Sequence, residues 1–92
     1  MSSGYRWFWE NEGKADATAN GLTFAEVIEA LEDDRRVDFW RDGNELVTFY
    51  TEVAPRRVLR VICYRKDRMS PVMRIIGARL LNDNELRQWK ER

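Results

Sequence analysis

The chain has 92 residues, of which 43% are hydrophobic and 35% are charged, and its 16 basic and 16 acidic side chains give a formal net charge of zero. This composition is typical of an ordinary globular protein and excludes a disordered one. No apolar stretch approaches the length of a membrane span, and the first residues lack the apolar core of a signal peptide. We therefore expect one domain, residues 1–92, without membrane association.

Cysteine and histidine usage restricts the chemistry. The chain has a single cysteine, Cys63, and no histidine. An intramolecular disulfide is thus excluded, and together with the lack of a signal peptide this favours the cytoplasm. Histidine-based triads and metal sites are excluded as well, so the sequence predicts no cofactor and no metal. The acidic run at residues 32–34 is more typical of a solvated helix end than of a Mg²⁺ site.

Charge is distributed unevenly along the chain. Residues 1–52 contain 5 Lys/Arg and 12 Asp/Glu, a net charge of −7, whereas residues 53–92 contain 11 and 4, a net charge of +7. In one compact domain the two halves would neutralise each other. The functional alternative is a basic face that binds a polyanion.

The first part of the chain reads as one strand and two helices. Tyr5–Glu10 is aromatic and partly alternating, which predicts a strand. Asn11–Lys14 reads as a turn that leads into a short helix, Lys14–Asn20. Thr23 and Glu26 have the spacing of a capping box at the start of a second helix. The apolar stripe of that helix follows the i, i+3, i+4, i+7 pattern and consists of Phe24, Val27, Ile28 and Leu31.

The period then changes to that of strands. Arg36–Arg41 and Glu45–Val53 predict a hairpin, Val58–Arg65 and Val72–Ala78 predict two further strands, and a helix is expected from Asp83 to about Lys90. This order predicts an α+β fold, an antiparallel sheet of about four to five strands packed against two N-terminal helices and one C-terminal helix. The turns expected between the strands are Asp42-Gly43-Asn44 and Ala54–Arg57.

Alternation assigns the strand residues to two faces. One face is apolar enough to pack against helices, with Val47, Phe49, Thr51 and Val53 in one strand and Leu59, Val61 and Cys63 in the next. Aromatic and arginine side chains share the other face, and this combination is found both where sheets bind nucleic acid and at protein interfaces. The residues expected there are Trp40, Tyr50, Arg60, Tyr64 and Arg74.

The segment Pro71–Trp89 carries two arginines, Arg74 and Arg79, on an apolar strand and its exit. Their separation of five positions would send them to opposite faces of a regular strand. They can serve one site only if the strand bulges or ends near Gly77. Asn82 and Glu85, which come next, have the spacing of another capping box.

The order of these motifs resembles the BrnT family, toxins of bacterial toxin–antitoxin pairs with a RelE-like ribonuclease fold. The residues that carry the resemblance are Trp9-Glu10, Asn20–Phe24, Arg74–Arg79, Glu85 and Trp89. Asn20 stands where the family has a histidine, and Trp89 stands where it has a tyrosine. The resemblance implies a metal-independent endoribonuclease with an RNA substrate, neutralised by a cognate antitoxin.

The resemblance also implies site residues. Arg74, Arg79 and Glu85 are the expected catalytic residues, and Arg60, Tyr64, Trp89 and Asn20 are the expected RNA-binding residues. A structural role is the alternative for several of them, since Glu85 also fits a helix cap and an arginine of the strand can pair with Glu52 or Glu85 to hold the last helix.

Two alternatives to the nuclease are equally compatible with the sequence. The same fold could act as a non-catalytic protein-binding module, which neutral charge, the missing family residues and four tryptophans favour. A sheet that binds RNA without cleaving it is the other. Exposed aromatic side chains also favour association, either with a second copy of the chain or with another protein.

Overall fold

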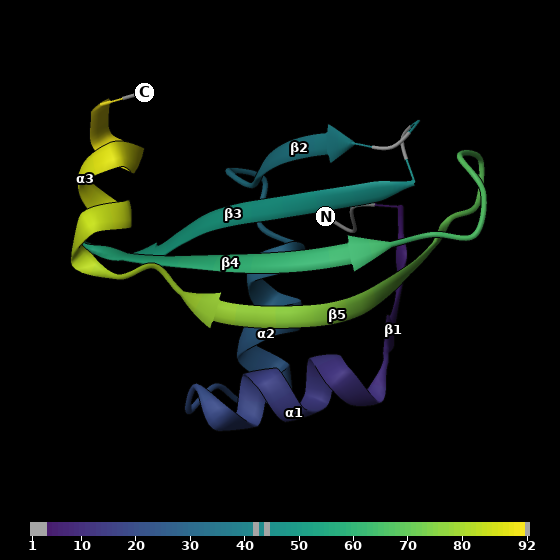
Figure 1. The fold of residues 1–92 in the computed structure, drawn as a ribbon, viewed down its shortest axis with the longest axis horizontal. Coiled ribbons are helices and arrows are strands. Elements are labelled where there is room, and N and C mark those ends of the chain that lie inside the picture. The colour runs from purple at the N-terminus through teal and green to yellow at the C-terminus, as the bar shows by residue number, and fades with distance from the viewer. Residues whose placement is uncertain (1–3, 42, 44, 92) are drawn as a thin grey trace.

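A five-stranded sheet and three helices make up the part of the chain that our computed structural model describes, residues 4–41, 43 and 45–91 (Figure 1). The α+β class and the order of the elements are as predicted from the sequence. In chain order the elements are β1 (Arg6–Trp9), α1 (Asn11–Ala19), α2 (Phe24–Leu31), β2 (Val37–Arg41), β3 (Leu46–Ala54), β4 (Arg57–Tyr64), β5 (Val72–Leu80) and α3 (Asp83–Glu91).

The strands lie in the order β1-β5-β4-β3-β2. From β2 to β5 they form the expected antiparallel meander. The prediction of a purely antiparallel sheet is wrong at β1, which pairs in parallel with β5 from Arg6 opposite Val72 to Trp9 opposite Ile75. Alternation along a strand determines its faces, but it carries no information on the partner or direction of a distant strand. Of the predicted turn between β2 and β3, Asp42 and Asn44 lie outside the described residues.

Helix α1 continues along the edge of β5 where β1 ends. The Ile75 carbonyl accepts a hydrogen bond from Glu10 N at 3.1 Å, and Asp16 Oδ2 accepts one from Ala78 N at 2.8 Å. Gly13 is buried, and its missing side chain lets the helix backbone approach the Ile75 carbonyl. The helix therefore begins at Asn11 rather than at Lys14, because the glycine serves a close contact rather than the predicted turn.

The core lies between one face of the sheet and the helices α1 and α2, and α2 passes behind the sheet in Figure 1. The capping box of α2 is confirmed, since Thr23 Oγ1 accepts from Glu26 N at 3.1 Å and Glu26 Oε1 accepts from Thr23 N at 2.9 Å. Val53 is an exception to the predicted faces, because a register shift beside it leaves it 45% exposed. The buried strand residues of the core are Val47, Phe49, Leu59, Val61, Cys63, Met73, Ile75 and Ala78.

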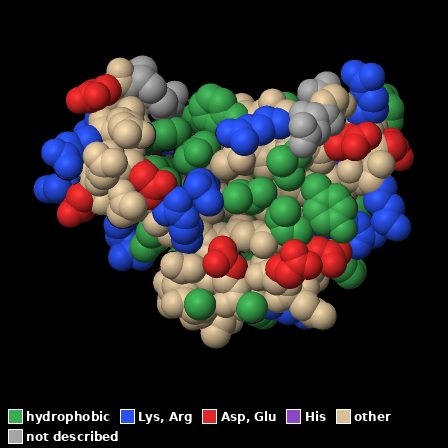
Figure 2. All heavy atoms as spheres, viewed as in Figure 1, with side chains coloured by type: hydrophobic (Ala, Val, Ile, Leu, Met, Phe, Trp, Pro, Cys, Tyr) green, Lys and Arg blue, Asp and Glu red, His purple; other side chains and the backbone are tan. Residues whose placement is uncertain are grey.

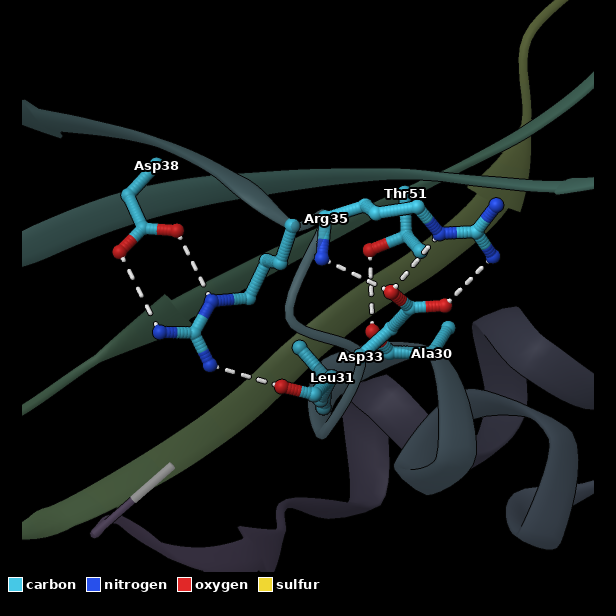
Figure 3. A network of polar contacts seen from close by, with 7 residues as sticks. Ala30, Leu31, Asp33, Arg35, Asp38 and Thr51 are labelled. Atoms are coloured by element: carbon cyan, nitrogen blue, oxygen red, sulfur yellow. Dashed lines mark hydrogen bonds and ion pairs between the residues drawn. The ribbon is translucent and has the colours of Figure 1, made fainter. Parts of the chain in front are cut away.

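Polar contacts fix the end of α2 to the sheet (Figure 3). Buried Thr51 donates its hydroxyl hydrogen to the carbonyl of Ala30 at 3.0 Å, and Arg36 donates to the carbonyl of Leu31 at 2.7 Å while pairing with Asp38. These side chains thus bind two carbonyls at the end of the helix, of which that of Ala30 also accepts from Asp33 N at 3.2 Å. The strand β2 is consequently held at a defined distance from the helix layer.

The acidic run that follows α2 is also engaged in contacts. Glu32 accepts a hydrogen bond from Trp7 Nε1 at 2.8 Å, and Asp33 pairs with Arg35 at 2.9 Å. Within residues 4–41, 43 and 45–91, no three acidic, histidine or cysteine side chains are grouped closely enough to hold a metal ion. A helix with the length and apolar character needed to span a membrane is likewise not found among these residues.

The placement of Trp40 predicted from the sequence is wrong. Trp40 pairs with Val47 and contacts Phe49 edge-on at 6.5 Å, which puts it on the core side of the sheet. Its neighbour Phe39 occupies the opposite side and is 45% exposed. Two adjacent aromatic residues leave a register ambiguity of one position, and such a slip exchanges the faces of a strand.

Candidate functional site

The side of the sheet opposite α1 and α2, which we call the open face, carries the arginines predicted to be functional. Figure 2 shows this face, with hydrophobic side chains gathered over the strands and basic side chains between them and α3. One row across the strands consists of Tyr50, Arg60 and Arg79. A second row consists of Leu46, Tyr64, Arg74 and Phe8.

A bulge in β5 brings Arg74 and Arg79 to the same face. Ile62 of β4 pairs with Gly77, but the next residue, Cys63, pairs with Ile75, so that Ile76 is an extra residue on β5. The extra position reverses the alternation between the two arginines. Gly77 is buried, and a Cβ there would lie 3.3 Å from Asp16 Oδ2, so the site favours the smallest residue. The sequence predicts that Arg74 and Arg79 share a face only if the strand bulges or ends near Gly77, and the structure contains this bulge.

Arg79 is held by the last helix. Its two terminal nitrogens each donate to one oxygen of Glu85 at 2.7 Å, a bidentate ion pair. Glu85 also accepts from Asn82 N at 3.0 Å, while Asn82 Oδ1 accepts from Glu85 N at 2.9 Å, which confirms the capping box of α3. The hydrogen bonds from Arg79 lower the pKa of Glu85 from its ordinary value of 4.5 to about 2, with a further contribution from Asn82. The structural role predicted for Glu85 is therefore present.

This ion pair predicts a pH dependence of stability. Because the pKa of Glu85 is lower in the folded protein than in the unfolded chain, its stabilisation is full above about pH 5 and disappears as the pH falls towards 2. Glu85→Gln keeps a capping side chain and removes the charge. We expect wild type to be more stable than Glu85→Gln in urea unfolding at pH 7, with the difference shrinking at pH 3. Glu29→Gln, at an exposed position of α2, is the control for loss of a carboxylate. A difference for Glu85 that is unchanged between pH 7 and pH 3 would contradict this account.

Arg74 shares the face but has its own surroundings. It pairs with Glu10 at 2.9 Å, and its guanidinium lies 4.9 Å from the centre of the Phe8 ring. Its partner on β4 is Tyr64, whereas the partner of Arg79 is Arg60, four positions away. Four residues of strand span about 13 Å. Arg74 and Arg79 therefore lie on the same face of the sheet but form two separate positively charged sites.

Arg60 is the least satisfied of these arginines. It lies between Tyr50 and Arg79, and its buried Nε has no hydrogen-bond partner among the residues that the structure describes. Two like charges thus face each other across β4 and β5, and the bidentate carboxylate of Glu85 is committed to Arg79. An anion bound beside Arg60 would relieve both the repulsion and the unsatisfied donor.

The two remaining residues predicted to bind RNA, Trp89 and Asn20, lie in different parts of the structure. Trp89 of α3 stacks on Tyr50 at 5.1 Å, which brings it onto the open face beside Arg60. Asn20 lies at the end of α1, outside the open face, where its Nδ2 donates to the Asp16 carbonyl at 2.7 Å. The structure therefore does not bring Asn20 together with the arginines of the open face.

Sequence reasoning missed part of this surface. A groove of about 410 Å³ runs between α3 and the open face at β2 and β3. The contact between α3 and β3, where Trp89 stacks on Tyr50, creates this groove. No local sequence pattern predicts such a contact. Alternation could have identified Phe39 had the register of β2 been known. The groove is lined by Phe39, Trp40, Arg41, Thr48, Tyr50, Leu81, Glu85, Gln88 and Trp89.

Comparison with known proteins identifies the fold. No protein-family model matches the chain, and no curated protein matches it by sequence. Among solved structures, the crystal structure of the Brucella abortus ribonuclease toxin BrnT is similar, with a TM-score of 0.60 and 16% sequence identity. The match covers 86% of this chain and 99% of that one. The chain therefore has a BrnT-like α+β fold, as the resemblance in its sequence predicted.

Proposed function

We propose that the protein is the toxin of a bacterial toxin–antitoxin pair and acts in the cytoplasm as a metal-independent endoribonuclease. The fold it shares with a ribonuclease toxin supports this function. The observation that carries the proposal is the bulge in β5, because it adds Arg74 and Arg79 to the face that already holds Arg60. Three arginines beside stacked aromatic rings suit the backbone and bases of single-stranded RNA.

In this proposal the scissile phosphate binds between Arg60 and Arg79. The RNA's own 2′-hydroxyl attacks phosphorus to form a 2′,3′-cyclic phosphate, and the bond to the 5′-oxygen of the next nucleotide breaks, with that oxygen taking a proton from water. Guanidinium groups stabilise the negative charge that develops on the phosphate oxygens. Arg74, about 13 Å along the strands, binds a neighbouring phosphate, and Tyr64 beside it stacks on a base.

Glu85 is the proposed proton acceptor. In the free protein both of its oxygens accept from Arg79, which keeps its pKa at about 2. A phosphate that draws the Arg79 donors away would free one oxygen and raise the pKa of Glu85. The carboxylate could then take the proton of the attacking 2′-hydroxyl. Substrate binding and activation of the base are thus coupled through one arginine.

The direct test is RNA cleavage by the purified chain in the presence of EDTA. We expect cleavage of total RNA by wild type and at least a tenfold lower rate for Arg74→Ala/Arg79→Ala, because the scissile phosphate and a neighbouring phosphate each lose one cationic contact. Lys66→Ala/Arg68→Ala removes the same charge from an exposed loop and serves as the control. Absent cleavage in every protein, or equal cleavage in the double variant, contradicts the proposal.

A second candidate function is a non-catalytic protein-binding module. It is favoured by the ion pairs of Arg74 with Glu10 and of Arg79 with Glu85, which already satisfy two of the three arginines. Expression in bacteria separates the two functions. A toxin arrests growth, and a small protein encoded by the neighbouring gene relieves the arrest by covering the open face. A binding module recovers a stable small partner without arrest and without cleavage.

A further inference from the structure

The groove between α3 and the open face has features that the proposed chemistry at the phosphate does not use. Phe39 lies edge-on to Tyr50 at 5.5 Å and is 45% exposed, although it is a large apolar side chain. Tyr50 is itself stacked on Trp89. Aromatic rings on β2, β3 and α3 therefore surround a volume of about 410 Å³.

The groove also contains two uncharged polar side chains, Gln88 and Thr48. Gln88 contributes an amide with a donor and an acceptor, and Thr48 contributes a hydroxyl. Such groups can hydrogen-bond the edge of a planar heterocycle while the rings contact its faces. The combination matches the two surfaces of a nucleobase, which has an apolar face and a polar rim.

Charge connects the groove to the arginines. Arg41 lines it directly, and Glu85 lines it while holding Arg79. A ligand in the groove thus has cations within reach on both sides. An apolar peptide segment would bring no anion to Arg41, whereas a nucleotide brings a phosphate together with its base.

We infer that this groove is a base-binding subsite that takes one unstacked nucleobase of a single-stranded RNA next to the bound phosphate. Phe39 supplies the exposed ring on which the base stacks, and Gln88 reads its edge. The inference rests on the proposed RNA substrate. It adds a specificity-determining residue, Gln88, that lies outside the arginine row.

Binding of nucleoside 3′-monophosphates, measured by calorimetry and by tryptophan fluorescence, tests the subsite. Ribose 5-phosphate, which has a phosphate and no base, is the reference ligand. We expect at least one of the four nucleotides to bind about tenfold more tightly than ribose 5-phosphate, and Phe39→Ala to abolish that advantage. Phe24→Ala, which removes a ring of similar exposure, 41%, from α2, should bind as wild type does.

Gln88→Ala changes an exposed helix position and leaves the rings in place. It should reduce the preference among the four nucleotides while affinity for ribose 5-phosphate stays constant. If Phe39→Ala lowers the melting temperature, Phe39→Leu keeps most of the side-chain volume without the aromatic ring and is expected to lose the advantage in the same way. Loss of the stacking contribution is then separated from loss of the fold.

Several results would overturn the inference. One is equal affinity of wild type for nucleotides and ribose 5-phosphate; another is nucleotide binding that survives Phe39→Ala. A third is a Phe39→Ala protein that binds nucleotides normally and no longer binds its partner protein, which would assign the groove to that partner. Cleavage of RNA without any base preference in binding would leave the proposed nuclease intact and remove only the subsite.

Discussion

Replacing Gly13 with alanine is expected to lower the free energy of unfolding by about 3 kcal/mol, at the upper end of overpacking effects. The new Cβ would lie 2.8 Å from the carbonyl carbon of Ile75 and closer still to its oxygen, and both are backbone atoms of the sheet. Neither α1 nor β5 can move aside freely, because Asp16 binds Ala78 N and Glu10 N binds the Ile75 carbonyl. In a chain of this size the loss corresponds to a decrease of about 12–24 °C in melting temperature.

The sign of this effect is diagnostic. Helix propensity alone predicts that Gly→Ala within a helix stabilises by about 0.8–1.0 kcal/mol. Thr18→Ala, at an exposed position of the same helix, tests propensity without the contact and should be neutral or slightly stabilising. Thermal unfolding of both variants measures the difference. A Gly13→Ala protein as stable as wild type would show that α1 does not rest on β5 in this way.

Replacing Arg60 with methionine is expected to separate stability from activity. The free energy of unfolding should rise by about 1 kcal/mol, because the change removes an unsatisfied buried donor and a like charge opposite Arg79. The cleavage rate on RNA should fall by about a hundredfold or more, because a cation that faces the scissile phosphate is lost. Urea unfolding and the cleavage assay, run on the same preparation, measure the two effects.

Arg79→Met is the matched variant on the adjacent strand. It should lower stability instead, since it leaves Glu85 without its bidentate partner. Opposite changes in stability for these two variants would show that the folded protein provides polar partners for Arg79 and not for Arg60. If Arg60→Met lost both stability and cleavage, its role would be structural, and the phosphate site would have to lie elsewhere.

The elements with local signals were predictable from the sequence. The capping boxes at Thr23 and Asn82, the hairpin of β2 and β3, and the faces of β4 depend on residues close together in the chain, and the structure confirms them. Arg79 and Glu85 are six positions apart, and their pairing was among the alternatives that the sequence offered. The BrnT-like fold followed from the order of such motifs.

What could not be predicted depends on contacts between distant segments. The parallel pairing of β1 with β5 and the ion pair of Arg74 with Glu10 join opposite ends of the chain. Gly13 resembled a turn residue because its close contact lies on another element. The sequence alone could not predict the bulge in β5. One extra residue in a strand becomes recognisable only when the register of the neighbouring strand is known.

The pairing of β1 with β5 also has a consequence for biosynthesis. Arg6 and Val72 are partners 66 positions apart, so β1 has no strand to join until β5 has been made. Contacts of such long range close late and slow folding. The pair of Arg74 with Glu10 forms across the same junction, so the open face cannot form before β5 is present. The nascent chain therefore carries no completed open face until β5 has been synthesised and can pair with β1.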